Sequence, residues 1–335
     1  MSKKKVLILK NDRTGDLFVS LNAINKIINK HYNEDMDIFL SDVNHKFSFL
    51  FPKLNKKKIS MNLSIFEKIR IFFYLLFNNV RTVYILTPKN FYYYLPFFFR
   101  KIRFYGITIK SDKSRPSLFL KKYLYKSAEL DRINIKKRKS SYEIQSSLID
   151  TNLDRNYLNN EISINHTFLY PKNFIYFHYK RSLFENLLKW DLETICKFLE
   201  ILSNRYENIL FSSELNDQNK NNFFSNRFNT FDFINNKKID LNKKNIFFLK
   251  DIDGSDLFDA VKKSSKIISP EGIITHMGYY LNKPLLALMH FNLHKRQDFI
   301  SQIISCKEWF PPTNYKFIVL KKNFDKSIQK ISKRI

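Results

Sequence analysis

The stretch KVLILKNDRTGDLFVSLNAINKI, residues 5–27, decides the expected fold. Its first six residues form a short apolar run bounded by turn formers, which is typical of a buried parallel strand. A polar turn with one glycine follows, and apolar residues then recur at helical spacing from Leu17 to Ile28. A strand, a glycine-containing turn and a helix open a βαβ unit. The sequence therefore predicts a mostly parallel sheet covered by helices on both faces.

The same alternation continues along the chain and restarts after a polar stretch at 153–173. Further strands are expected at 36–41, 80–87, 102–107, 174–179, 208–213, 245–250, 266–270 and 284–289. Helices are expected at 64–77, 90–101, 117–128, 141–153, 192–206, 255–264, with Ser255 as its N-cap, and from about 273. We therefore predict an α/β protein of two Rossmann-like domains facing across a cleft, with ligands at the carboxyl ends of the strands.

The bulk composition agrees with two domains and a polyanionic partner. A chain of 335 residues with 44% hydrophobic residues supplies two cores, which we expect at 1–165 and 166–335. The excess of 58 Lys and Arg over 31 Asp and Glu gives a net charge of +27, which favours anionic lipid, phosphorylated glycolipid or nucleic acid as partner. A compositional bias toward surface lysine explains the same excess. No RNA-binding module is recognisable, so no nucleic acid is expected.

Cysteine usage and hydropathy bear on the compartment. The two cysteines, Cys196 and Cys306, belong to no CxxC motif, which fits a reducing compartment without structural zinc. The apolar run near the start is too short for a signal peptide, and no stretch has the roughly 18 uncharged apolar residues of a spanning helix. We expect a cytoplasmic protein, either soluble or peripheral on the inner face of the cytoplasmic membrane.

The first candidate site is the turn that follows the first strand. Gly15 can take positive φ and lets the backbone approach a ligand closely, while Lys10 and Thr14 can add hydrogen-bond donors. Asp16 falls at the start of the helix, where its carboxylate can accept a proton from an acceptor hydroxyl as a general base. The alternative is that Asp16 only complements the positive end of the helix dipole. A dinucleotide-binding GxGxxG motif is absent.

The second candidate site is ISPEGIITHMGYYLNKPLLAL at 268–288, where a strand ends and a helix begins. Free backbone amides and the dipole at the start of that helix can hold a diphosphate, with Thr275 and His276 in the first turn. Glu271 and Gly272 form the turn, and Glu271 can accept hydrogen bonds from ribose hydroxyls. The alternative for His276 is a packed histidine with a local hydrogen bond.

Two further motifs carry weaker signals. Lys189 precedes a predicted helix and can neutralise phosphate charge, although a solvated lysine is the default, and its neighbour Trp190 is expected to pack. The DID sequence at 251–253 superficially matches the DxD motif of metal-dependent sugar transferases. Because Asp256 and Asp259 fit the first turn of the next helix, these acids are interpreted as helix-dipole partners, and no metal is predicted.

The region 65–106 is both aromatic and basic, with FFYLLF, FYYYLPFFFRK and IRFYG. Such segments can enter a bilayer interface, with aromatic rings among the headgroups and Arg100, Lys101 and Arg103 on phosphates. Ordinary burial of a Phe-rich helix against the sheet is the alternative.

These motifs, in this order, resemble glycosyltransferase family 9, the heptosyltransferases of the lipopolysaccharide inner core. The opening at 5–27 looks like that family's strand, GD turn and first helix, and SPEGIITHMGYYLNKPLLALM looks like its donor-site motif. LLKWDLETICKFLEIL is similar to its Lys/Arg-Trp-Pro segment. The family usually has Asp where Glu271 stands, a second glycine near Ile273, and a glycine-containing turn where HYKRS stands at 178–182.

The resemblance implies a GT-B fold and an inverting, metal-independent transferase without a cofactor. It implies Asp16 as general base, Lys189 as a phosphate contact, and Glu271, Gly272, Thr275 and His276 as contacts of a nucleotide diphosphate sugar, with ADP-heptose the family's commonest donor. The acceptor would be a lipopolysaccharide-core or related glycolipid. The alternatives are another GT-B enzyme with a different donor, including a retaining one, and a non-catalytic basic protein that binds polyanions.

Overall fold

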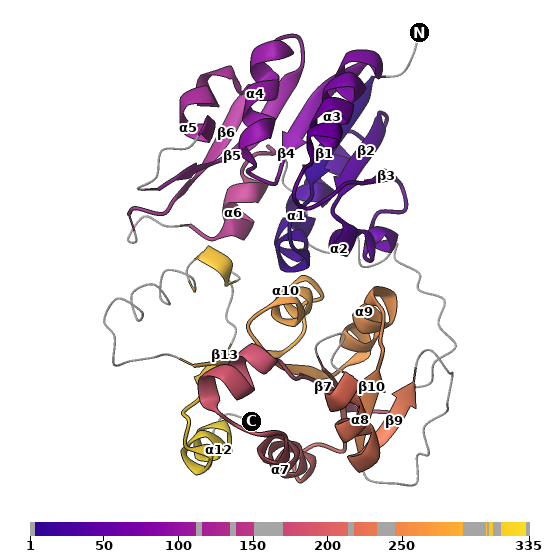
Figure 1. The fold of residues 1–335 in the computed structure, drawn as a ribbon, viewed down its shortest axis with the longest axis vertical. Helices are drawn as coiled ribbons and strands as arrows, with labels where there is room; N and C mark the ends of the chain where they lie inside the picture. Colours follow the sequence, from indigo (N-terminus) through magenta and orange to yellow (C-terminus); the bar gives the residue numbers. More distant parts are fainter. Residues whose placement is uncertain are drawn as a thin grey trace. The chain divides into compact units, whose positions relative to one another are not determined.

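The computed structural model describes residues 4–111, 116–134, 139–150, 170–213, 218–232, 245–290, 306, 308–310 and 316–332. The chain forms two compact units, 1–163 with 301–312 and 164–300 with 313–335. Each unit is built around one parallel sheet (Figure 1). The expected roles of the two predicted domains, acceptor binding in 1–165 and nucleotide-sugar binding in 166–335, stay a prediction.

The sheet of the first unit has six parallel strands in the order β3-β2-β1-β4-β5-β6. They are β1 (Lys5–Lys10), β2 (Asp35–Leu40), β3 (Asn55–Lys58), β4 (Val80–Ile85), β5 (Arg103–Lys110) and β6 (Lys126–Asp131). The first strand lies at the centre, so the strand order reverses between β1 and β4. That reversal is the topological switch point, where an open α/β sheet binds its ligands at the carboxyl ends of the strands.

Helices cover both faces of this sheet (Figure 1). They are α1 (Thr14–Lys30), α2 (Asp42–His45), η1 (Ser48–Leu50), α3 (Ile65–Phe77), α4 (Asn90–Phe98), α5 (Pro116–Phe119), η2 (Leu120–Tyr123) and α6 (Ser141–Ser146). Ser64 begins α3 with a capping box, in which its hydroxyl accepts from the Glu67 amide and the Glu67 carboxylate accepts from the Ser64 amide. α1 buries the apolar stripe that the sequence predicts, including Leu17, Leu21 and Ile24.

The second unit has a seven-stranded parallel sheet in the order β13-β12-β11-β7-β8-β10-β9. The strands are β7 (Phe174–His178), β8 (Asn208–Ser212), β9 (Asn229–Asp232), β10 (Ile246–Lys250), β11 (Lys266–Pro270), β12 (Leu285–Met289) and β13 (Lys316–Val319). The helices are η3 (Ser182–Leu188), α7 (Leu192–Ser203), α8 (Gln218–Arg227), α9 (Gly254–Lys263), α10 (Ile273–Tyr280) and α12 (Phe324–Ser332). Here the order reverses between β7 and β11, which marks the switch point of this sheet.

The structure confirms most predicted elements, corrects one helix and one N-cap, and adds elements that were not predicted, among them β3, α8, β9, β13 and α12. The helix expected at 117–128 is wrong, because only short turns of helix occupy 116–123 and β6 follows, paired with β5. The polar strand β3 was not predicted, since its sequence NKKK lacks an apolar face and only pairing with β2 makes it a strand. The N-cap of α9 is Asp253 rather than Ser255.

Candidate active site

The loop after β1 is fixed by hydrogen bonds from neighbouring elements of the first unit. Asn11 is fully buried, its side-chain amide donates to the Ser60 carbonyl at 2.9 Å, and its Oδ1 accepts from the Tyr92 hydroxyl at 2.8 Å. Ser41 donates to the Asp12 carbonyl at 2.7 Å. This network holds the start of α1 in place at the carboxyl edge of the sheet.

Asp16 lies in the first turn of α1, where the sequence places it. Burial raises the pKa of its carboxyl to about 6, opposed by the positive charge of Lys10 and reinforced by the negative charge of Asp12. Lys10 is almost completely buried at the end of β1, and its Nζ donates to the Oδ2 of Asp12 at 2.7 Å. The result is a carboxylate whose pKa is close to the pH at which a general base works best.

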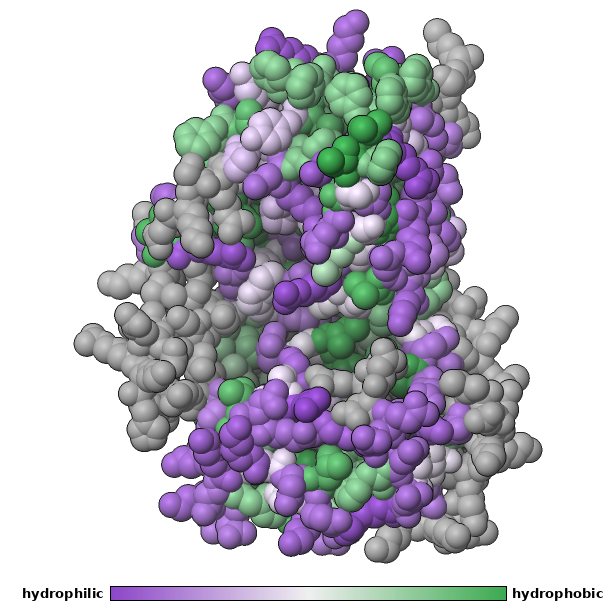
Figure 2. Space-filling model, viewed as in Figure 1, coloured by the Kyte–Doolittle hydropathy of each residue, from purple (hydrophilic) through white to green (hydrophobic). Residues whose placement is uncertain are grey.

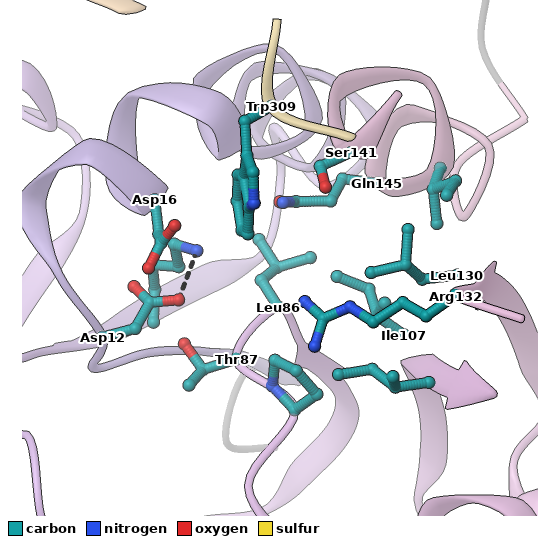
Figure 3. A pocket seen from close by; sticks show the side chains of 14 residues that line it. Asp12, Asp16, Leu86, Thr87, Ile107, Leu130, Arg132, Ser141, Gln145 and Trp309 are labelled. Carbon is teal, nitrogen blue, oxygen red and sulfur yellow. Dashed lines mark hydrogen bonds and ion pairs between the residues drawn. The ribbon is translucent and has the colours of Figure 1, made fainter. Parts of the chain in front are cut away.

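A pocket of about 290 Å³ opens at this edge of the first unit, at the switch point between β1 and β4. Lys10 lines this pocket and donates to Asp12. Asp12 and Asp16 lie on the same side of the pocket, and Thr87, which follows β4, lies beside them (Figure 3). Apolar side chains at the ends of β5 and β6 complete much of the lining. They are Ile107, Ile109 and Leu130.

The opposite part of the pocket comes from β6, α6 and the returning segment 306–310. Arg132 extends its guanidinium into the pocket, and Trp309 places its indole between Asp16 and Gln145 (Figure 3). The Nε of Arg132 donates to both carboxylate oxygens of Glu308, at 3.1 and 3.2 Å, and Glu308 is only 3% exposed. Ser140 also donates to the Phe310 carbonyl at 3.3 Å. These contacts attach the Trp309 segment to the first unit.

The other predicted residues of this turn, Thr14 and Gly15, belong to the first turn of α1. Thr14 begins α1, and its side chain is half-buried. Gly15 is the second residue of α1 and does not use the positive φ that glycine can adopt. The turn ends two residues before Gly15, at Arg13, which has extended backbone angles as the N-cap.

The second predicted site forms a single turn in the second unit, between β11 and α10. Gly272 has φ +153, a conformation that side chains rarely adopt, and its amide donates to the Thr275 hydroxyl at 3.1 Å. That hydroxyl donates in turn to the Gly272 carbonyl at 2.6 Å. Glu271 is half-buried in the same turn, and Thr275 is buried. The structure therefore brings all four predicted donor residues, His276 included, to one helix start.

Lys180, which the sequence analysis did not select, joins this turn from the end of β7. Its Nζ donates to the Glu271 carbonyl at 2.6 Å and would lie 3.3 Å from a Cβ placed on Gly272. Burial and the nearby charge of Lys180 lower the pKa of His276 to about 4. His276 is therefore neutral at pH 7 and can donate only through one ring N–H. The same two causes lower the pKa of His178 to about 3.

Lys189 is exposed to solvent, whereas the neighbouring Trp190 is buried. Lys189 is exposed and takes left-handed angles, with φ 61, at the end of η3. Trp190 is 3% exposed, its Nε1 donates to the Lys322 carbonyl at 2.9 Å, and its ring packs against Phe184 and Phe324. The expectation that Trp190 packs is confirmed.

The acids of the DID motif serve local structure. The Oδ1 of Asp253 accepts from the amides of Ser255 and Asp256, both at 2.8 Å, so it caps α9. Among the described residues, no group of three or more His, Cys, Asp or Glu side chains is arranged to hold a metal ion. In the same part of the chain, no helix combines the length and the apolar content needed to cross a bilayer.

Comparison with solved structures finds the same fold in sugar-nucleotide enzymes. E. coli heptosyltransferase WaaC with ADP-2-deoxy-2-fluoro heptose superposes with a TM-score of 0.67 at 10% identity, covering 99% of this chain and 100% of that one. The glycosyl transferase family 9 structure from Veillonella parvula DSM 2008 has a TM-score of 0.60 at 12% identity, covering 99% and 90%. The chain has the GT-B fold.

That fold also occurs in UDP-GlcNAc 2-epimerase from Methanocaldococcus jannaschii, with a TM-score of 0.55 at 14% identity, covering 98% of this chain and 92% of that one. No protein-family model and no curated protein matches the sequence. Likeness at this level of identity confirms the predicted fold, while the chemistry has to be argued from the site.

In each GT-B unit, the residues missed by sequence reasoning lie at the carboxyl edge of the sheet. Lys180 follows β7 and Asp12 follows β1, so their position directly after a predicted strand was the available signal. Arg132 follows β6, a strand whose first half overlaps the helix that was predicted at 117–128. Trp309 had no local signal, because it reaches the pocket from the far end of the chain.

Proposed function

We propose that this chain is an inverting, metal-independent glycosyltransferase that moves a heptose-like sugar from a nucleotide diphosphate donor to a glycolipid acceptor. The observation that carries the proposal is the carboxyl of Asp16, which lines a sugar-sized pocket and has its pKa raised by burial to about 6. An ordinary carboxylate is a weak base, whereas one with a pKa near 6 is ionised at pH 7 and accepts a proton more readily.

In the proposed reaction, an acceptor hydroxyl transfers its proton to Asp16 as its oxygen attacks the anomeric carbon of the donor. The bond from that carbon to the diphosphate oxygen breaks as the new glycosidic bond forms on the opposite face. The nucleoside diphosphate leaves with the electron pair, and the configuration at the anomeric carbon inverts. The chain's own residues position the hydroxyl, accept its proton and stabilise the charge on the leaving diphosphate.

The donor end of this reaction is assigned to the turn between β11 and α10. The amides at the start of α10, the ring N–H of His276 and the ammonium of Lys180 supply donors for a diphosphate. Glu271 and Thr275 are assigned to the nucleoside and sugar hydroxyls. Since Asp16 belongs to the other unit, transfer requires the two carboxyl edges to face each other in the working enzyme.

The pocket beside Asp16 is assigned to the acceptor. Its apolar lining and the half-exposed indole of Trp309 fit the ring face of a sugar, and Lys10 and Arg132 favour a negatively charged substituent. Such an acceptor fits the inner face of the cytoplasmic membrane, which we propose as the site of action. ADP-heptose is the first donor to test, because a structural relative was determined with an ADP-heptose analogue.

Replacing Asp16 with Asn tests the assignment of the base. Transfer from ADP-heptose to a deacylated inner-core acceptor should fall by about 10²–10⁴ fold, the usual contribution of a general base, while donor binding stays within about twofold. Asp42→Asn is the matched control, since Asp42 is an exposed acid at the start of α2. Equal activity of the Asp16 variant and the wild type would overturn the assignment.

Product analysis separates the proposal from its rivals. An inverting transferase gives a product whose anomeric configuration is opposite to that of the donor, and a retaining GT-B enzyme preserves it. An epimerase of the same fold changes the nucleotide sugar without any acceptor, so incubation of donor alone identifies it. Salt-sensitive binding to polyanions without turnover of any nucleotide sugar would favour the non-catalytic basic protein.

A further inference from the structure

The outer side of α3 exposes large apolar side chains, although the solvent-facing side of a surface helix is normally polar. Phe66, Ile69, Phe73, Leu76 and Phe77 recur at intervals of three, four, three and one residues, so they share one face of the helix. Phe66 is 83% exposed and Phe77 is 74% exposed. The opposite stripe of α3 packs on the sheet. The helix is thus apolar on two sides, of which only one is covered by this chain.

This face continues onto the neighbouring elements. Phe72 contacts Phe98 and Phe99 of the α4 end, with ring centroids 5.9 and 4.8 Å apart, and Phe97 contacts Tyr123 of η2 at 5.5 Å. Figure 2 shows hydrophobic residues gathered over the part of the first unit where Figure 1 places α3 and α4. We call the exposed apolar residues of α3 and α4, together with Phe119 at the end of α5, the aromatic face. They are Ile65, Phe66, Ile69, Phe73, Leu76, Phe77, Tyr94, Phe97, Phe98 and Phe119.

Basic side chains border the aromatic face. The guanidinium of Arg100 lies 5.6 Å from the ring centroid of Phe97, and the ammonium of Lys122 lies 5.2 Å from that of Tyr123. Arg70, Lys101 and Lys121 are exposed in the same elements or directly beside them. Two acids occur nearby. Glu67 is held by the capping box, and Glu129 pairs with Lys121 at 3.1 Å. The border therefore carries a clear excess of positive charge.

We propose that the aromatic face docks on an anionic phospholipid bilayer, with its Phe and Ile side chains among the acyl chains and its basic border on the lipid phosphates. Exposed aromatic and aliphatic residues framed by Lys and Arg are the composition of interfacial membrane-binding helices. The basic border favours an anionic bilayer over a second copy of the chain as the partner. Apolar contact alone also suits a second copy of the chain, but two copies would bring like charges together, whereas an anionic bilayer neutralises them.

The position of the aromatic face also suits transfer to a lipid-anchored acceptor. In this respect the inference rests on the proposed function. The end of α3 is joined to the start of β1 by the Lys5 amide, which donates to the Asn79 carbonyl at 3.3 Å. The beginning of α3 lies near the carboxyl edge, because Ser60 contacts both Asn11 and Glu67. α3 thus runs the length of the sheet. A bilayer against its outer side would lie beside the pocket edge and leave the pocket open to a lipid-anchored sugar.

Sedimentation of the full chain with vesicles tests the proposal. The chain should bind vesicles of phosphatidylcholine with about one third phosphatidylglycerol, bind pure phosphatidylcholine at least about tenfold more weakly, and lose affinity as salt rises. The combined variant Phe66→Gln, Phe73→Gln and Phe77→Gln should lower the partition coefficient at least about tenfold. Tyr32→Gln is the matched control, because Tyr32 is 76% exposed outside the aromatic face.

A second variant guards against a folding defect. Arg100→Gln with Lys101→Gln leaves the apolar residues intact and should reduce binding to the anionic vesicles alone. Binding by the phenylalanine variant equal to wild type, or no binding by the wild type, would overturn the proposal. So would a dimer in light scattering that the phenylalanine substitutions dissociate in the absence of lipid. Transfer to a deacylated acceptor should persist in both variants, so loss of vesicle binding is distinguishable from failure of the proposed activity.

Discussion

The ammonium of Lys10 donates to the carboxylate of Asp12 across 2.7 Å, at the base of the pocket that Asp16 lines. Lys10 is only 1% exposed, so its charge is directed to Asp12 and is shared with Asp16 at longer range. Lys10 lowers the pKa of Asp16 and Asp12 raises it, while burial makes the largest contribution and brings that pKa to about 6. The pair therefore adjusts the basicity of the carboxylate that we propose as the catalytic base.

The first prediction concerns the pH dependence of transfer. Asp16 acts as a base only when it is ionised, so kcat/KM should fall as the pH drops below about 6, with a limiting slope of one. The measurement is an initial-rate profile from about pH 3.5 to 8 at constant ionic strength. An acid limb near pH 4, the ordinary range of an aspartate, would show that burial does not raise the pKa of Asp16.

Replacing Asp12 with Asn should move that acid limb to lower pH. The substitution removes the negative charge that raises the pKa of Asp16 and leaves the charge of Lys10 without its partner. Both changes favour ionised Asp16, so its pKa falls and it becomes a weaker base. The pH profile of the variant measures the shift, and kcat at pH 8 should fall modestly, by less than about tenfold. A shift toward higher pH would contradict the assignment of charges.

Asp16 should also cost the protein stability at neutral pH. Its folded pKa of about 6 exceeds the ordinary value of 3.8, so the folded state binds a proton more tightly than the unfolded state. This destabilisation is absent below about pH 4 and fully present above about pH 6. Asp16→Asn should therefore raise the free energy of unfolding by about 1–2 kcal/mol at pH 8, after discounting for solvent screening, and by almost nothing at pH 4. Thermal unfolding at both pH values measures this difference.

Lys180→Met should raise the pKa of two histidines and weaken donor binding. The charge of Lys180 helps to lower the pKa of His276 and that of His178, so its removal lets both rise from about 4 and about 3. Proton NMR titration of the ring C–H signals measures these shifts. We expect KM for the donor to rise about tenfold, the loss of one charge-assisted contact to a phosphate. Arg181→Gln is the control, since Arg181 is the neighbouring exposed cation, and it should leave both histidines unchanged.

Much of the fold is predictable because its signal is local. β1, α1 and the start of α10 each follow from an apolar run, a turn and helical spacing in one continuous segment. The elements that were missed depend on distant partners. β3 is a strand only because β2 offers its edge, and β6 is a strand because β5 does, against local sequences that favour turns or helix.

The same division applies to the site. Asp16 and the four residues of the donor turn lie in the turn or the first helical turn that follows a predicted strand, so sequence reasoning finds them. The environment that tunes them is not encoded nearby. The raised pKa of Asp16 depends on burial in the folded unit, and the lowered pKa of His276 depends on burial and on Lys180, which lies 96 residues earlier in the chain. Position in a motif is local information, whereas basicity is a property of the packed structure.

The last prediction concerns the segment that carries Trp309 into the pocket. Trp309→Ala removes an aromatic wall beside Asp16, so KM for the acceptor should rise about tenfold while KM for the donor stays unchanged. Glu308→Gln acts on the same segment by a different route, because it weakens the ion pair with Arg132 and leaves a guanidinium without a countercharge. It should raise the acceptor KM and also lower the free energy of unfolding by about 1–3 kcal/mol. Trp309→Phe, which keeps an aromatic ring, should recover most of the acceptor affinity. If instead both KM values rise together in Trp309→Ala, the pocket is not specific to the acceptor, and Trp309 acts through the general stability of the first unit.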